Sequence, residues 1–306
     1  MNTAKNNSQK TVSGVWYAVA AFSAWGVLPV YWKLLHRVPA VEILAHRILW
    51  SFIFVSLLVT FSRGWGNVKG ALATPKNCLV FLGASILITA NWGIYIWAVN
   101  AGHIVDASLG YYINPLLSVT LGIVFLRERL NFWQISSLVL ALAGVAFLTV
   151  EYGKIPWIAL SLALTFGFYG LMKKIAAAPS ITGLTLETAA VTPLALGYLL
   201  WQHLNGSGSF GVGSIQETLL LMGAGIITAT PLLWFAKANN RVPLSTVGFT
   251  QYLTPTFSLI LGVFVYQEQF TRVETCSFGL IWLALLIYSF SQTSFMQGLQ
   301  PKRFRA

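Results

Sequence analysis

Apolar residues occur along the whole chain in runs of about twenty, separated by short polar segments. A helix that crosses the hydrocarbon core of a bilayer needs roughly 20 mostly apolar residues. The pattern therefore predicts an all-α, polytopic membrane protein with ten transmembrane helices. The predicted spans are 13–34, 41–62, 78–98, 104–125, 131–150, 156–172, 181–202, 217–237, 244–265 and 273–292.

Composition agrees with a lipid environment. Of the 306 residues, 56% are hydrophobic and only 9% are charged, and the mean hydropathy is +0.70. A soluble domain has roughly a quarter of its residues charged. The first apolar run is too long and too bulky for the core of a cleaved signal peptide, so we expect it to be an uncleaved first span.

The distribution of basic residues predicts the orientation. The formal net charge is +11, but no basic run is dense enough to follow a phosphate backbone, and we expect no nucleic-acid partner. With the N-terminus inside, fourteen of the nineteen Lys and Arg residues fall on the cytoplasmic side, four fall outside, and Arg47 lies within a span. This bias follows the positive-inside rule. It predicts cytoplasmic N- and C-termini, which requires an even number of spans.

The two halves of the chain are similar when the sequence is shifted by 140 residues, without a gap from about Leu79 to Leu148. The matched positions include Asn100 with Asn240, Tyr112 with Tyr252, Pro115 with Pro255, and Glu128 with Glu268. We therefore expect two five-helix repeats, residues 1–150 and 151–306. Because five is an odd number, the second repeat is predicted to be inverted, as in many alternating-access transporters.

Several motifs resemble those of a known group of permeases. They are Trp25-Gly26 followed by Pro29, the run 42–51 (EILAHRILWS), the run 91–100 (NWGIYIWAVN) and the run 108–116 (SLGYYINPL). In these motifs the chain resembles RarD-type permeases of the EamA branch of the drug/metabolite transporter superfamily. The resemblance implies ten helices in two inverted repeats in a bacterial inner membrane, moving small organic solutes.

Proline and polar residues within the fourth and ninth spans predict where a solute would bind. Pro115 and Pro255 occupy matching places, and paired helix interruptions in the two halves of a transporter point to the binding site. Polar and aromatic residues recur around them at helical spacing. An alternative is that these groups only bridge helices. The candidate substrate-binding residues are Trp25, Asn91, Trp92, Tyr95, Tyr111, Asn114, Gln251, Tyr252 and Thr254.

No basic residue is expected at mid-depth beside these groups, which favours a neutral, zwitterionic or aromatic solute over a phosphate. Tyr169 is expected to help close the wall of the cavity, together with Trp25.

Two charged residues within the spans are candidates for gating, since charge inside a membrane is costly and usually functional. Arg47 and Glu187 are each about six residues into their spans, roughly 9 Å from opposite surfaces. We expect Arg47 to pair with Asp106 or Glu42 in an outer gate. Glu187 is expected to pair in an inner gate with Lys237 or a neighbouring cation. Static neutralisation of the charges is the alternative.

Three classes of function compete for this sequence. A secondary carrier for small molecules fits best, and a channel or sensor-like subunit is the alternative. No catalytic cluster and no ATP-binding loop occur, so we expect neither an enzyme nor an ATP-driven pump. Cys78 and Cys276 lack metal-ligand spacing, and no metal or cofactor is expected.

The expected partners are a small-molecule substrate and membrane lipid, in a monomer or homodimer. A proton is a candidate coupling ion, carried by His46, His103, Asp106 or Glu187.

Overall fold

The computed structural model describes residues 2–100, 103–153, 155–176, 178–212, 214–265, 271–291 and 293–301. Within these ranges the chain is helical, without strands, and has ten helices long and apolar enough to cross a membrane. This result confirms the predicted ten-span, all-α architecture. The spans are Gln9–Leu34, Ala40–Phe61, Pro75–Tyr95, Leu109–Leu126, Phe132–Glu151, Trp157–Ala176, Ser180–Leu204, Ile215–Asn239, Leu244–Val265 and Arg272–Phe290.

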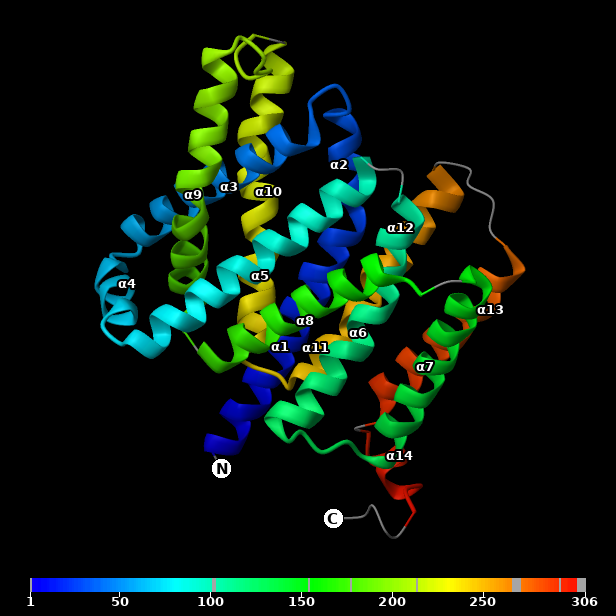
Figure 1. The fold of residues 1–306 in the computed structure, drawn as a ribbon. Helices are drawn as coiled ribbons and strands as arrows, with labels where there is room; N and C mark the ends of the chain where they lie inside the picture. Colours follow the sequence, from blue (N-terminus) through cyan, green and yellow to red (C-terminus); the bar gives the residue numbers. More distant parts are fainter. Residues whose placement is uncertain are drawn as a thin grey trace.

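The helical elements follow one another in a bundle (Figure 1). They are α1 (Asn2–Val27), α2 (Pro29–Leu34), α3 (Ala40–Phe61), α4 (Trp65–Leu72), α5 (Pro75–Asn100), α6 (Ile104–Leu126), α7 (Phe132–Tyr152), α8 (Trp157–Ala176), α9 (Ser180–Leu204), α10 (Ile215–Asn239), α11 (Leu244–Gln251), α12 (Leu253–Ile260), the π-helix η1 (Leu261–Val265), α13 (Arg272–Phe290) and α14 (Ser294–Gly298).

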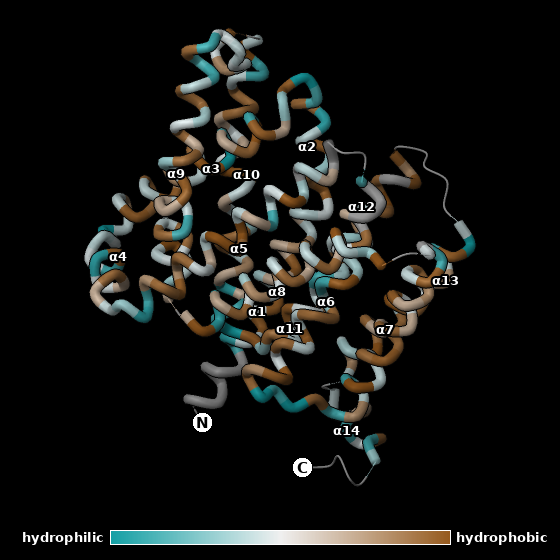
Figure 2. Tube along the Cα trace, viewed as in Figure 1, coloured by the Kyte–Doolittle hydropathy of each residue, from teal (hydrophilic) through white to brown (hydrophobic). Residues whose placement is uncertain are grey.

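The start of α1 and the short helix α14 lie at one end of the bundle, which we call the proximal end (Figure 1). The connection between α9 and α10 lies at the opposite, distal end. Hydrophobic residues run along the helices, whereas hydrophilic residues gather at the connections (Figure 2). Large side chains such as Leu79, Phe125 and Leu194 are exposed on the outside of the helices. Their exposure fits helices that face lipid rather than water.

Local sequence explains where the helices begin. Asn131, Ser214 and Thr271 each form a capping box with the residue three positions later, at the start of α7, α10 and α13. Glu128 accepts hydrogen bonds from the first backbone N–H groups of α11, those of Leu244 and Ser245. A carboxylate is favourable at this position because the N-terminus of a helix carries partial positive charge.

The two matched prolines have different effects. The ninth span breaks at Tyr252, between α11 and α12, next to Pro255. Proline lacks an N–H group and its ring crowds the carbonyl of the residue four positions earlier, here Gln251, where α11 ends. The fourth span, by contrast, continues as one helix through Pro115. The expected pair of interruptions is therefore present in only one half.

The packing of the helices repeats between the halves. The contact of α1 with α10 is matched by that of α8 with α5, and the contact of α6 with α8 is matched by that of α12 with α1. Two glycines fit this pattern. A Cβ on Gly26 would lie 2.5 Å from Phe257 Cβ, and a Cβ on Gly167 would lie 3.0 Å from Leu117 Cδ2. Both pairs are related by the sequence repeat. Since successive spans alternate in direction, the second five-helix repeat is inverted.

Candidate functional site

A cavity of about 420 Å³ lies between the two repeats, with walls from both. Its walls are mostly aromatic and polar. The aromatic lining residues are Phe22, Trp25, Trp32, Trp92, Tyr95, Tyr111, Tyr112 and Phe166. The polar and charged ones are Arg47, Asn91, Asn114, Thr228, Gln251, Thr254, Ser258 and Glu274.

Eight of the nine residues predicted to bind substrate line this cavity. The exception is Tyr252, which is 1% exposed and packs with Ala141, Val145 and Ile281, from α7 and α13. Its expected position was wrong because consecutive helical residues point about 100° apart, and Gln251, one position earlier, takes the cavity side. Tyr252 therefore belongs to the packing between the fifth, ninth and tenth spans.

Several polar groups of the lining also hold helices together. The Asn91 side chain donates to the Leu162 carbonyl at 2.9 Å and to Thr165 Oγ1 at 3.0 Å. Thr254 Oγ1 donates to the Phe22 carbonyl at 2.9 Å, and Ser118 Oγ donates to Gln251 Oε1 at 3.1 Å. The bridging alternative therefore describes part of these residues' contacts. In contrast, Asn114 Oδ1 is buried without a hydrogen-bond partner among the residues that the structure describes.

Arg47 lies on the cavity wall and is held there by uncharged groups. Its Nε donates to Thr228 Oγ1 at 3.0 Å, and its guanidinium carbon lies 4.7 Å from the ring centroid of Trp32 and 4.9 Å from that of Trp92. Arginine packs well between aromatic faces in this way. No cation was expected beside the polar residues of the spans, yet Arg47 lines the same cavity as Asn91 and Asn114. A lack of positive charge therefore no longer excludes an anionic solute.

The expected pairing of Arg47 with Glu42 was wrong. Glu42 accepts hydrogen bonds from the backbone N–H and Oγ of Ser209, at 2.6 and 3.0 Å, and lies 4.0 Å from His46 Nε2. Glu42 thereby ties the connection between α9 and α10 to the start of α3. Asp106, the other expected partner, has a side chain outside the part of the chain that the structure describes.

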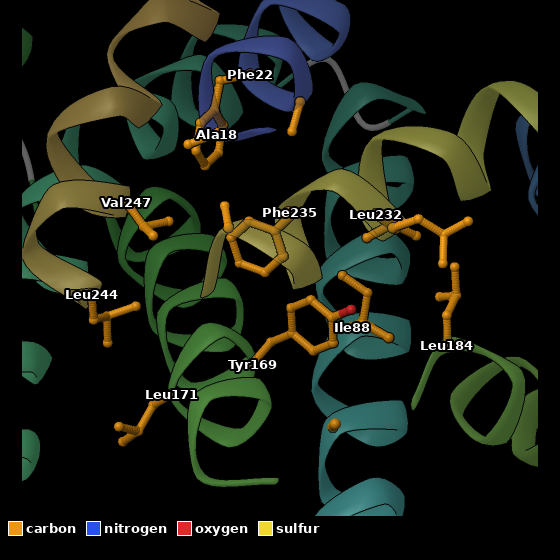
Figure 3. Packing of buried hydrophobic residues seen from close by; sticks show 14 of the residues in the cluster. Ala18, Phe22, Ile88, Tyr169, Leu171, Leu184, Leu232, Phe235, Leu244 and Val247 are labelled. Carbon is orange, nitrogen blue, oxygen red and sulfur yellow. The ribbon is translucent and has the colours of Figure 1, made fainter. Parts of the chain in front are cut away.

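Packed aromatic side chains form the proximal floor of the cavity. The rings of Tyr169 and Phe235 stack with centroids 5.9 Å apart, and Phe22 meets Phe235 edge-on at 6.0 Å. Figure 3 shows these rings beside Ile88 and Leu232. Of these residues, Phe22, Ile88 and Leu232 line the cavity. Tyr169 is fully buried and lies below the cavity, so it is part of the floor and not of the wall.

Beyond the floor, a buried ion pair links α8 and α9. Lys173 Nζ lies 2.8 Å from Glu187 Oε1, and Tyr169 donates to Glu187 Oε2 at 3.0 Å. Of the two expected alternatives, Lys237 was wrong, and the partner is a neighbouring cation, Lys173. Lys237 lies 4.9 Å from the ring centroid of Tyr17 and lines a separate hollow of about 370 Å³. Lys173 lies in the last turn of α8, and Glu187 lies about two turns into α9, the next helix along the chain.

Glu274 is a cavity residue that sequence reasoning missed. It lies in the first turn of α13, and its Oε2 accepts from both the backbone N–H and Oγ1 of Thr271 at 2.8 Å. The spacing of Thr271 and Glu274 signals a helix cap. Nothing in that signal indicates that the carboxylate also faces a cavity. Within the described ranges, no group of three His, Cys, Asp or Glu residues could hold a metal ion.

Comparison with known proteins gives the family. The EamA-like transporter family matches the chain twice, over residues 12–150 and again over residues 154–290. This chain belongs to the EamA-like transporter family. The two matches agree with the two repeats, and the membership makes the protein a multi-pass membrane transporter.

Relatives of this EamA-family transporter span nearly the whole chain. It is 48% identical over 294 residues to the "Uncharacterized transporter YojE" of Bacillus subtilis, covering 94% of this chain and 97% of that one. It is 41% identical over 282 residues to "Protein RarD" of Escherichia coli, covering 92% and 95%. It is 30% identical over 278 residues to the "Chloramphenicol-sensitive protein RarD" of Pseudomonas aeruginosa, covering 90% and 92%. The chain is thus a RarD-type permease of this family.

A solved structure shares the fold of this EamA-family transporter. That structure, titled "Crystal structure of protein", superposes with a TM-score of 0.70 at 18% sequence identity, covering 93% of this chain and 99% of the other. At this identity the likeness supports the fold alone.

Proposed function

We propose that this transporter is a secondary carrier that moves small organic solutes across the bacterial inner membrane by alternating access. The observation that carries the proposal is the one-sided shape of the central cavity. Its lining includes Pro29 and Trp32 in the distal α2 and Glu274 in the first turn of α13. Towards the proximal end, the floor around Tyr169 and Phe235 is closed.

The inverted repeat supports the alternation. In an inverted pair, the two repeats exchange conformations, and the cavity then opens to the other side. Arg47 and Glu187 are related by the 140-residue shift. Arg47 lines the open distal part, and Glu187 lies in the closed proximal part. A conformational exchange would separate Glu187 from Lys173 and open the proximal end.

The same shape argues against the channel or sensor alternative. A channel needs a continuous water-filled path, whereas packed aromatic rings close this cavity at one end. A carrier needs such a closure in each of its end states. The carrier is proposed to have cytoplasmic termini, so that the distal end faces the periplasm. It is also proposed to act without ATP or a catalytic step, with a proton as the coupling ion.

Counterflow in proteoliposomes tests this function. Vesicles that contain the purified protein are loaded with a mixture of unlabelled metabolites, and entry of labelled library members is measured. We expect a subset of solutes to enter faster than into empty vesicles. Substitution of Trp25 or Asn114 with Ala should slow that entry by about tenfold. The control is Leu194→Ala, on the lipid-facing surface. Equal entry with and without protein for every member would reject the carrier.

A further inference from the structure

Arg47 is a cation within a membrane span, and it has no anionic partner among the residues that the structure describes. Its neighbours are Thr228 Oγ1 and the faces of Trp32 and Trp92. No carboxylate among the residues that the structure describes lies within ion-pair distance of it. The contrast with Lys173, which has Glu187 at 2.8 Å, is direct.

An unneutralised charge inside a membrane protein is costly. Charged residues at that depth normally pair with each other or face a cavity, and they mark solute pathways. Arginine has five N–H donors in a planar fork, and Thr228 takes only the one on Nε. The guanidinium carbon lies over the rings of Trp32 and Trp92, which take none of its remaining N–H donors as conventional hydrogen-bond acceptors. Those donors match the two oxygens of a carboxylate.

We propose that Arg47 binds the carboxylate of the transported solute, and that the substrates are small organic monocarboxylates with an aromatic or apolar portion. The solute would supply the counter-charge that the described protein lacks. This inference rests on the proposed function, because it assigns a substrate class to the same cavity.

The cavity walls favour one negative charge and not two. Among the described lining residues, Arg47 is the only Lys or Arg, and Glu274 adds a carboxylate. A phosphate dianion would meet one cation and one like charge, whereas a monocarboxylate is matched by Arg47 alone. Trp25, Trp92 and Phe166 line the same cavity and supply flat apolar surface for the rest of the solute. A volume of about 420 Å³ suits a small molecule of this kind.

Binding can be tested without knowing the natural solute. The purified full chain in detergent is heated with acids and with their neutral amides: 3-phenylpropanoate and 3-phenylpropanamide, indole-3-acetate and its amide, and 4-methylpentanoate and its amide. We expect at least one acid to raise the unfolding temperature, and its amide to have no effect at the same concentration. Arg47→Gln should weaken binding of that acid by about tenfold or more, the loss of one charge-assisted contact.

The matched control is Arg37→Gln, which removes an exposed arginine at the distal end and should leave the affinity within about twofold. Thr228→Val is the second variant, because it keeps the charge of Arg47 and removes its hydrogen-bond partner. If Arg47→Gln does not fold, the proposal is tested by comparing acids with amides on the native chain and on Thr228→Val. We expect Thr228→Val to weaken binding of the acid and to leave the result with the amide unchanged.

Three results would overturn the assignment. They are equal stabilisation by acids and amides, no stabilisation by any acid, and tighter binding of phenyl phosphate than of the acids. Failure of the proposed function has a different signature. In that case acids bind through Arg47, but counterflow of the bound acid into proteoliposomes is absent. Conversely, the protein could transport uncharged solutes equally well with and without Arg47→Gln. That result would support the carrier function and reject carboxylates as its substrates.

Discussion

The distal and proximal halves of the transport path differ although the sequence repeat relates them. Arg47, in the distal half, lies beside an open cavity and contacts uncharged groups. Glu187, its repeat equivalent, is 2% exposed and is paired with Lys173 below the aromatic floor. The same position in the two repeats thus holds opposite charges in opposite states. The comparison indicates that each repeat contributes one charge to its own end of the path, and that only one end is open.

The largest expected effect concerns the proximal ion pair. Glu187→Ala leaves Lys173 buried without its partner, and losing one member of a buried pair costs about 3–5 kcal/mol of unfolding free energy. Chemical denaturation of the purified protein would measure the loss. Arg47→Ala should cost less, since no described ion pair is broken. The double variant Lys173→Met, Glu187→Leu should recover most of the stability. A double variant as unstable as the single one would contradict the pairing.

The two related glycine contacts should differ in their tolerance of a methyl group. In Gly26→Ala the new Cβ would lie 2.5 Å from Phe257 Cβ and 2.9 Å from the Thr254 carbonyl oxygen, both of which are hard to displace. We expect a loss of about 1–3 kcal/mol in unfolding free energy. In Gly167→Ala the Cβ meets the ends of the Leu117 and Leu121 side chains at 3.0 and 3.1 Å, which can rotate away. Its loss should be under about 1 kcal/mol, because alanine also favours the helix. Equal losses would show that the repeats pack more alike than described.

Accessibility measures which end is open. After Cys78 and Cys276 are replaced with serine, Thr228→Cys in the cavity should react with a polar thiol reagent, and Thr188→Cys, which is buried near Glu187, should not. Adding Glu187→Ala should raise labelling of Thr188→Cys by about tenfold, as expected if the closed state loses about 1.4 kcal/mol. Glu217→Ala, at a part-exposed capping residue of α10 far from this pair along the chain, is the control. Unchanged labelling at Thr188→Cys would show that Glu187 does not help to keep the proximal end closed.

The smallest effect is expected at Tyr252. Its hydroxyl is buried without a hydrogen-bond partner among the described residues, and its ring packs away from the cavity. Tyr252→Phe should change the unfolding free energy by less than about 0.5 kcal/mol and leave counterflow unchanged. The comparison variant is Tyr111→Phe, whose residue lines the cavity. If counterflow falls in Tyr252→Phe but not in Tyr111→Phe, Tyr252 contributes to substrate binding after all.

The sequence predicted the spans well because hydrophobic length and flanking charge are local properties. It also selected residues that line the cavity, eight of nine, since Asn91, Asn114 and Gln251 stand out as polar residues in apolar helices. The count of residues from a span entrance gives depth, however, and not the direction in which a side chain points. For that reason Arg47 was expected to pair with Asp106 or Glu42 in a gate, and its place on the cavity wall was not predicted.

Ion-pair partners were harder to predict than the lining. The choice between Lys173 and Lys237 for Glu187 depends on how α8, α9 and α10 are placed relative to one another, which the local sequence does not reveal. Glu274 was missed because its capping role explains its place in the sequence completely. Interruptions were expected at both Pro115 and Pro255, but only the ninth span breaks. Proline only disfavours a continuous helix, and the surroundings decide whether the helix breaks.

One contact near the cavity sets a limit on how the helices can move. A Cβ on Gly225 of α10 would overlap the backbone carbon of Trp50 in α3, and Ser51 Oγ donates to the Gly225 carbonyl at 3.0 Å. Backbones this close cannot slide past each other without a clash. We expect α3 and α10 to stay fixed relative to each other while the other helices tilt around them. Arg47 and Thr228 lie one turn from this contact. The proposed carboxylate-binding group would therefore move little when the distal end closes and the proximal end opens.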